Sequence, residues 1–316
     1  MKAIEITAIW FAMLLLVGCS HELTDVDAGS GGLHLCISLD RKAFLDYEPI
    51  FLEWTFRNTT KSIVKIANAT ADVYFTFCLV DSGGERHLCS PPECPTLGPL
   101  QITILAQGES TKARIDLRDY LASHPLGSLT LFAVYKPPEL RGTQDFLSSK
   151  LTSNTIELEI RPARGQDGKA AKLVAEAIAK RGEGGYVGIF YLDRELSNRI
   201  IEDTSSSRFG AAANFYLGLR QFEEAKHLTL TKGQYMDKAS AYFRACIATK
   251  GNHYLRGLSY SYLLHCKAEG ATSISKDEAS RIAAILTEEY ADSWALMNAK
   301  SIIDKQKGDV PASDAP

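Results

Sequence analysis

Four side chains that can bind metal ions lie in one short segment: His87, Cys89, Glu93 and Cys94. Imidazole and thiolate groups are good ligands for zinc or copper. Ser-Pro-Pro-Glu separates the two cysteines, however, and this close spacing allows a disulfide that would remove two strong ligands. We therefore name Cys89 and Cys94 as the candidate disulfide and expect neither a metal site nor a cofactor.

Two patterns typical of enzymes lack the context that their chemistry requires. The glycines of segment 182–188 follow an expected helix and have neither the strand nor the lysine of a phosphate-binding loop. Gly257, Leu258 and Ser259 begin like a nucleophile elbow, but Ser261 stands where the last glycine belongs, in a helical context. We expect a loop at the first and a packed or exposed serine at the second, and we assign no catalytic residue.

Four more cysteines are considered in pairs. Cys36 and Cys78 both lie opposite the apolar rows of their expected strands, so they could bridge on an outer face but are poor candidates for a core disulfide. Cys246 and Cys266 lie on expected antiparallel helices that turn near Gly251, which separates them by roughly 15 Å, beyond the limit of about 7 Å for bridged Cα atoms. We expect these two to be isolated thiols in the core.

Aromatic residues and acids give further weak signals. Tyr254, Tyr260, Tyr262 and Trp294 could present rings to a ligand, although aromatic stripes at helical spacing more often belong to a core. Asp116, Asp119 and Glu139 could hold a cation only if loops gathered them, and scattered loop acids are usually solvated. Neither set therefore identifies a site.

The amino end carries an export signal. Lys2 precedes an apolar run from Ile6 to Val17, which has the length of a signal-peptide core and is too short to span a bilayer comfortably. Leu16, Val17, Gly18 and Cys19 then resemble the lipobox of bacterial lipoproteins. The resemblance implies cleavage after residue 18 and acylation of Cys19. The alternative is an uncleaved anchor or an ordinary signal peptide that contains a cysteine.

Ser20 and the following segment extend this resemblance. In Gram-negative lipoproteins, serine directly after the acylated cysteine resembles an outer-membrane sorting signal, which implies a lipid-anchored protein of the cell envelope. Several acyl chains, palmitate among the fatty acids that such proteins carry, would attach the chain stably. Residues 19–32, which end in Gly-Ser-Gly-Gly, are expected to form a flexible tether.

Residues 33–162 alternate between apolar and polar positions. Leu33, Leu35, Ile37 and Leu39 share one side of an expected strand, and many short strands with one apolar face each favour two sheets that cover one another. This half therefore resembles an Ig-like sandwich. The further expected strands lie at 52–56, 63–66, 73–79, 102–104, 113–117, 129–135 and 156–160.

Residues 168–305 have helical spacing instead. Nine of the eleven prolines lie between Pro49 and Pro162 and none lies from Ala163 to Val310, so we place a linker at residues 161–168. Ser275 and Glu278 have capping-box spacing at a helix start. The further expected helices cover 173–178, 208–222, 235–246, 253–266 and 292–303, and residues 306–316 form an expected flexible tail.

Part of the helical half resembles tetratricopeptide-type hairpins. The segment Ala213–Leu219 and the segment Tyr235–Ile247 look like the two helices of such a hairpin. The match is partial, because residues 223–234 form an expected insertion between them and no clean repeat of about 34 residues recurs. A generic antiparallel helical bundle explains the same stripes.

The totals limit the classes of partner. The 316 residues suit two domains, and 45% hydrophobic residues provide material for buried cores. A formal charge of −3 provides no broad basic field, so we expect no nucleic-acid partner. The fold class expected is α+β, an all-β sandwich followed by an all-α domain, in a non-enzymatic envelope lipoprotein that binds or assembles another protein. The alternatives are an envelope hydrolase whose carboxylates meet only in three dimensions, and an accessory metal or redox role at Cys89 and Cys94.

Overall fold

A computed structural model describes residues 32–67, 74–89, 102–120, 125–137, 150–181, 189–249, 252–291 and 293–308. The expected signal peptide, Cys19 and the tether up to Gly31 lie outside the described residues. So do Glu93, Cys94, Glu139 and the glycine-rich segment 182–188.

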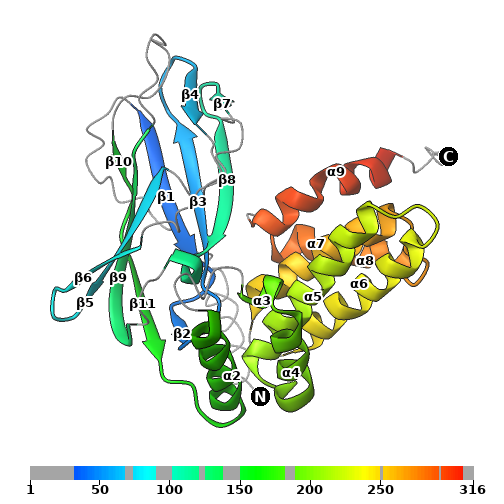
Figure 1. Cartoon of the computed structure of the whole chain (residues 1–316). Helices are drawn as coiled ribbons and strands as arrows, with labels where there is room; N and C mark the ends of the chain where they lie inside the picture. Colours follow the sequence, from blue (N-terminus) through cyan, green and yellow to red (C-terminus); the bar gives the residue numbers. More distant parts are fainter. Residues whose placement is uncertain are drawn as a thin grey trace, which may run out of the picture.

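Strands occupy the first part of the described chain, from Leu33 to Arg161, which we call the β part (Figure 1). Every strand expected from the alternating pattern is present, and three short strands (β2, β6 and β10) that the pattern did not predict are added. The strands are β1 (Leu33–Leu39), β2 (Ala43–Leu45), β3 (Phe51–Asn58), β4 (Val64–Ala67), β5 (Phe75–Asp81), β6 (Arg86–Cys89), β7 (Ile102–Leu105), β8 (Ser110–Asp116), β9 (Gly127–Tyr135), β10 (Leu151–Thr152) and β11 (Ile156–Arg161), with a 3-10 helix at Leu117–Tyr120.

The described strands form three sheets. The first has the order β1-β3-β8, the second has the order β2-β11-β9-β5-β6 with β10 also paired to β9, and the third is the two-stranded ribbon β4-β7. All described pairs are antiparallel except β2 with β11.

The first two sheets share one core. Trp54 of β3 stacks on Phe75 of β5 with ring centroids 5.2 Å apart, and Phe56 of β3 contacts Tyr135 of β9 at 5.0 Å. Leu35, Ile37 and Leu158 complete the same cluster from both sheets. Alternation therefore gives each strand one apolar face, and the opposite sheet buries that face.

Helices occupy the described chain after Arg161, and we call this the helical part (Figure 1). The observed layout is therefore α+β, with strands before helices. The helices are α2 (Gly165–Arg181), α3 (Ile189–Leu192), α4 (Arg194–Thr204), α5 (Arg208–Lys226), α6 (Lys232–Ala248), α7 (His253–Ala268), α8 (Lys276–Glu289) and α9 (Trp294–Gly308).

The helices differ from the expectation in several places. The helical spacing did not predict α3 and α4, and α9 continues to Gly308, into the expected tail. The insertion expected at residues 223–234 is wrong, because α5 continues to Lys226 and α6 already begins at Lys232. The polar residues that suggested a loop form ion pairs along the helix surface, such as Lys226 with Glu223 at 2.8 Å. The first helix also begins inside the expected linker, at Gly165, where φ is +60° and a residue with a side chain would be strained.

The helical core depends on close packing between aromatic rings and small residues. Phe215 of α5, Phe243 of α6 and Tyr262 of α7 contact one another, and Phe243 stacks on Tyr262 with centroids 5.3 Å apart. A Cβ atom added at Gly218 would lie 2.8 Å from the Phe243 ring. No helix within the described ranges is long and apolar enough to cross a membrane.

Candidate functional site

The outer face of the β1-β3-β8 sheet packs against the helices. Ile50, Phe51 and Leu52 are consecutive apolar residues, so β3 begins with apolar side chains on both of its faces. Leu52 points into the sheet core, whereas Phe51 belongs to the core of the helical part and stacks on Tyr254 of α7 at 5.1 Å. The two parts are thus joined by an apolar seam.

Arg114 of β8 lies in this seam among aromatic rings. Its guanidinium carbon is 4.6 Å from the ring centroid of Trp294 and 5.7 Å from that of Phe51, and it lies 5.9 Å from both Phe215 and Tyr254. These separations are those of cation–π contacts. Its Nη1 atom is buried and has no hydrogen-bond partner among the described residues. Phe51 belongs to the β part and the other three rings belong to the helical part, so Arg114 helps to hold the two parts together.

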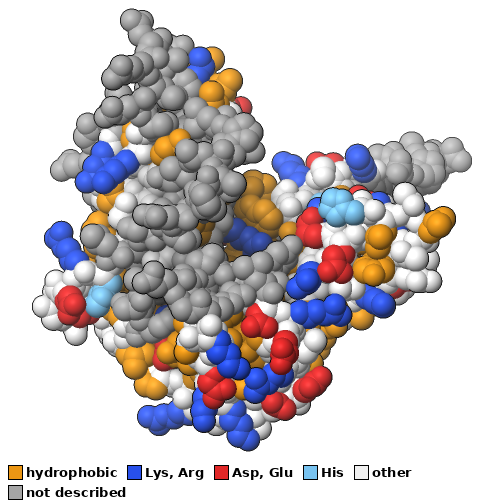
Figure 2. All heavy atoms as spheres, in the orientation of Figure 1, with side chains coloured by type: hydrophobic (Ala, Val, Ile, Leu, Met, Phe, Trp, Pro, Cys, Tyr) orange, Lys and Arg blue, Asp and Glu red, His pale blue; other side chains and the backbone are white. Residues whose placement is uncertain are grey.

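A hydrogen bond to the backbone of α9 also stabilises the seam near Arg114. Glu53 is the cross-strand neighbour of Arg114, and its Oε1 atom accepts a hydrogen bond from the backbone N–H of Trp294 at 3.1 Å. The carboxylate thereby satisfies an amide at the start of α9, where helices leave backbone donors unpaired. On the face shown in Figure 2, hydrophobic and basic atoms are visible at the junction between the β part and the helices.

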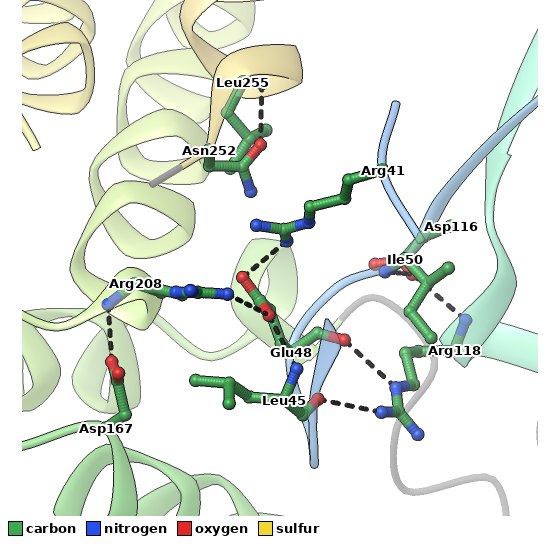
Figure 3. Close-up of polar contacts among 10 residues, drawn as sticks. All are labelled: Arg41, Leu45, Glu48, Ile50, Asp116, Arg118, Asp167, Arg208, Asn252 and Leu255. Carbon is green, nitrogen blue, oxygen red and sulfur yellow. Dashed lines mark hydrogen bonds and ion pairs between the residues drawn. The ribbon is translucent and has the colours of Figure 1, made fainter. Parts of the chain in front are cut away.

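A closed polar cluster lies deeper in the seam, around the fully buried Glu48 (Figure 3). Arg41 Nη2 donates to Glu48 Oε1 at 2.6 Å, and the Leu45 N–H donates to Oε2 at 2.8 Å. Arg208, the first residue of α5, lies 3.8 Å from the same carboxylate. Arg118 donates to the carbonyls of Glu48 and Leu45, both at 3.0 Å.

The environment of Glu48 identifies a structural role. Burial raises the pKa of this carboxyl group, while Arg41, the Leu45 amide and Arg208 act in the opposite direction. A perturbed buried acid is a common sign of an active site. Both oxygens of Glu48 already accept hydrogen bonds from the protein, however, and the side chain reaches no solvent. Glu48 therefore joins the β part to α5 and does not face a substrate.

An open groove of about 510 Å³ lies in the seam where Glu53 contacts the start of α9, and we call it the acidic groove. Four of its lining residues are acids and, within the described part of the chain, none is a lysine or arginine. Its wall is formed by the end of β1, by Glu53, by the start of α7 and by the segment from α8 to α9. The lining residues are Ser38, Leu39, Asp40, Glu53, His253, Tyr254, Glu288, Glu289, Tyr290, Ala291 and Ser293.

Several polar groups of the acidic groove are held by neighbours. The His253 and Tyr290 rings stack with centroids 4.5 Å apart, and the Tyr290 hydroxyl donates to the His253 carbonyl at 3.2 Å. Tyr290 is seated against Gly257, where an added Cβ atom would lie 2.5 Å from the ring. Ser293 Oγ donates to the Tyr290 carbonyl at 2.8 Å. These contacts fix the shape of the groove.

The charges of the acidic groove come from three parts of the chain: Asp40 after β1, Glu53 in β3, and the end of α8. Asp40 follows β1 and keeps part of its surface exposed to solvent, but neighbouring groups desolvate its carboxylate and raise its pKa, while Arg41 and His253 act against this rise. Glu288 and Glu289 are exposed in the last turn of α8, which contains no basic residue. Negative charge is unfavourable there, because the carboxyl end of a helix is already partially negative. A cation bound in the acidic groove would relieve this repulsion. Burial also raises the pKa of Tyr290 to about 12.

The residues proposed from sequence for metal binding are only partly described. His87 approaches Asp81, with 3.6 Å between Nε2 and Oδ2. One possible ligand atom each from Asp81, Glu85 and His87 lie within 4.8 Å of one another. Asp81 Oδ1 accepts hydrogen bonds from the backbone N–H groups of Gly83 and Glu85. The carboxylate therefore stabilises the turn between β5 and β6. The backbone of Cys89 pairs with that of Phe77, and the Cys89–Cys94 disulfide stays a prediction.

The remaining cysteine expectations can be compared with the structure. Cys246 and Cys266 are buried free thiols, as predicted, and burial raises the pKa of each to about 12. Cys36 and Cys78 do not form the outer-face bridge that the pattern allowed, since they belong to different sheets and are free. Ser259 is a buried residue of α7, so the apparent nucleophile elbow is a helix interior.

The sequence did not single out Asp40, Glu48, Glu53 or Arg114. The apolar run at Ile50, Phe51 and Leu52 is the one signal that a second layer covers the outer face of β3. Of the aromatic residues that were singled out, Tyr254 is buried and Tyr260, Tyr262 and Trp294 pack against the helical core, as the core interpretation predicted.

Comparisons with known proteins give little guidance. No family model and no curated protein matches the chain. Among solved structures, the sporulation control protein Spo0M from Bacillus subtilis is 12% identical over 48% of this chain and 57% of its own, with a TM-score of 0.27. A beta-glucosidase from Listeria innocua is 16% identical over 41% of this chain and 16% of its own, with a TM-score of 0.25. These scores assign neither a fold family nor a function.

Proposed function

We propose that the chain is a lipid-anchored envelope protein that binds a basic segment of another protein in the acidic groove. One observation carries the proposal: four carboxylates line a groove that has no lysine or arginine among its described lining residues. Opposite charges across an interface favour encounter and select the partner. A basic partner would also relieve the unfavourable charge of Glu288 and Glu289 at the end of α8.

The contacts within the acidic groove favour binding over hydrolysis. A nucleophile needs a base within hydrogen-bond distance, and the base needs an orienting group. Here His253 stacks on Tyr290, Ser293 Oγ donates to the Tyr290 carbonyl at the end of α8, and Glu53 accepts from the Trp294 amide. These side chains already serve the structure, and the remaining acids can bind a cation without any proton transfer.

We also propose finer fold assignments that agree with this role. The β part is an Ig-like sandwich, supported by the shared core of its two larger sheets. The helical part is an array of tetratricopeptide-like hairpins, supported by the short connection between α5 and α6. Both architectures commonly present binding surfaces, and this supports the proposal by analogy alone.

The anchor proposed at Cys19 is tested by metabolic labelling with palmitate in a Gram-negative host. We expect labelled wild-type chain in the outer-membrane fraction and no label on the Cys19→Ala variant, because the thiol is the acylation site. An unlabelled wild-type chain, or one that remains in the cytosol, contradicts the anchor.

Binding is tested by crosslinking and affinity capture from envelope membranes. The double variant Glu288→Gln/Glu289→Gln should reduce recovery of a basic partner about tenfold, because two charge pairs at roughly 0.5–1 kcal/mol each are lost. Its fold should be at least as stable as the wild type, since two unfavourable charges leave the end of α8.

The matched control is Glu202→Gln/Asp203→Asn, an adjacent exposed acid pair in the last turn of α4, outside the acidic groove. This control should leave capture unchanged. Equal capture by all three proteins contradicts binding in the acidic groove. Turnover of an envelope glycan by the purified chain, abolished by Asp40→Asn, would support the hydrolase instead.

A further inference from the structure

Three isoleucines are exposed on the ribbon β4-β7 and just before it. The exposed fractions are 62% for Ile63, 47% for Ile102 and 58% for Ile104. Ile102 and Ile104 are two positions apart on β7 and therefore share one face of the ribbon. In Figure 1, this ribbon stands at the end of the β part that lies away from the helices. We call these three residues and the ribbon the isoleucine tip.

Basic residues accompany the isoleucine tip. Lys65 of β4 is the cross-strand neighbour of Ile104, and the exposed Lys61 precedes Ile63. Figure 2 shows hydrophobic atoms beside basic ones at this end of the molecule. Apolar residues flanked by lysines are typical of surfaces that enter the headgroup region of an anionic bilayer.

The described chain begins at the same end. The carbonyl of Gly32 accepts a hydrogen bond from the Thr59 N–H at 2.6 Å. The neighbouring Asn58 Nδ2 atom donates to the carbonyls of Ser62 at 2.8 Å and Leu105 at 2.9 Å, the residues directly beside Ile63 and Ile104. One short network of hydrogen bonds thus connects the start of β1 to the isoleucine tip.

The length of the preceding segment favours contact between this end and a membrane. Twelve residues separate Cys19 from Gly32. A flexible glycine-containing chain of this length has a root-mean-square span of about 20 Å and a maximal span of about 45 Å. If Cys19 carries lipid, the isoleucine tip is therefore held near the bilayer at high effective concentration.

We propose that the isoleucine tip inserts into the headgroup region of the membrane to which Cys19 is attached. This inference rests on the proposed acylation of Cys19. The acidic groove is lined by Ser38, Leu39 and Asp40 at the opposite end of β1, about 20 Å from Leu33 along a seven-residue strand. Insertion of the isoleucine tip would therefore direct the acidic groove away from the bilayer, toward a soluble partner.

Site-specific photocrosslinking to lipid tests the contact in the full-length, acylated protein. The photoreactive residue p-benzoylphenylalanine replaces Ile104 in one variant and Leu126 in the other. Leu126 is the matched control, because it is 50% exposed and precedes β9 at the other end of the β part, where Gly127 pairs with Ile160 next to the start of the helical part. Both proteins are reconstituted in vesicles of phosphatidylethanolamine and phosphatidylglycerol.

We expect lipid adducts at position 104 to exceed those at position 126 at least about tenfold. With the photoreactive residue at position 63, Ile102→Asn/Ile104→Asn should reduce adducts severalfold, and Leu126→Asn should not. Circular dichroism verifies that each variant is folded.

Palmitate label on Cys19, measured in the same samples, separates the two ideas. Labelled protein without excess adducts at position 104 overturns the membrane contact and leaves the anchor intact. Absence of label overturns both.

Discussion

At the scale of single residues, Glu48 shows how a buried charge can serve structure rather than chemistry. Its carboxylate accepts from Arg41 and Leu45 and lies near Arg208, so it joins a loop of the β part to the first turn of α5. Removal of one partner from a buried ion pair leaves the other charge uncompensated, which is more costly than loss of the attraction itself.

We therefore expect Glu48→Ala to lower the free energy of unfolding by about 3–5 kcal/mol, measured by urea denaturation. The control is Glu159→Ala, which removes the partner of Arg161 in an exposed ion pair, and it should leave the free energy of unfolding almost unchanged. Similar losses in the two variants would contradict the structural role assigned to Glu48.

At the scale of elements, strands and helices were largely predictable because each carries its own periodicity. Ser275 is a clear example, since its side chain accepts from the Glu278 N–H as the capping pattern indicated. In a full capping box, the Glu278 carboxylate would accept from the backbone N–H of Ser275. Here that carboxylate binds Arg244 of α6 instead, at 3.1 Å. The sequence shows which residues can cap a helix, but a distant arginine can compete for the same carboxylate.

The acidic groove was not predictable either, because its residues meet only in the folded chain. Asp40 follows β1, Glu53 lies in β3 and Glu288 lies in α8, so no periodic spacing in the sequence connects them. The loop expected at residues 223–234 failed through a related ambiguity. Glu223, Glu224 and Lys226 are equally compatible with a loop and with the exposed face of a helix, and ion pairs along α5 favour the helix.

A pH-dependent contact holds α6 to the loop before α8. Asp237 accepts from Thr272 Oγ1 at 2.7 Å and from the Ser273 N–H at 2.8 Å. Burial alone would raise the pKa of Asp237, but these hydrogen bonds outweigh it, and the pKa lies below its usual value. The stabilisation is therefore complete above the unfolded pKa of about 3.9 and is lost as the pH falls through the folded pKa.

We expect wild type to be more stable than Asp237→Asn at pH 7, by up to about 1 kcal/mol, with a difference that shrinks as the pH falls below about 4. Urea midpoints recorded between pH 7 and pH 2.5 measure this difference. Thr272→Val removes one donor and should give an intermediate profile. A constant gap between wild type and Asp237→Asn at every pH would show that the Asp237 charge does not matter.

At the scale of the whole molecule, the seam sets the relative positions of the groove and the isoleucine tip. Phe51, Glu53 and Arg114 project from one sheet face onto α7 and α9, while the Glu48 cluster joins the same region to α5. Because residues of both parts line the acidic groove, its shape depends on the seam. A looser seam should therefore weaken binding without altering any acid of the groove.

The unfolding of Arg114→Ala tests this dependence. Loss of a desolvated cation–π cluster and of the packing around it should cost about 2 kcal/mol or more and weaken the coupling between the two parts. In a Trp294→Phe background, Trp54 of β3 reports the β part. In this background, we expect helical circular dichroism and tryptophan fluorescence to give one urea midpoint without the Arg114 change and two separate midpoints with it, because the parts then unfold independently. Arg57→Ala, an exposed arginine of β3, should retain one midpoint. Coincident, unshifted curves for Arg114→Ala would mean that other contacts hold the parts together.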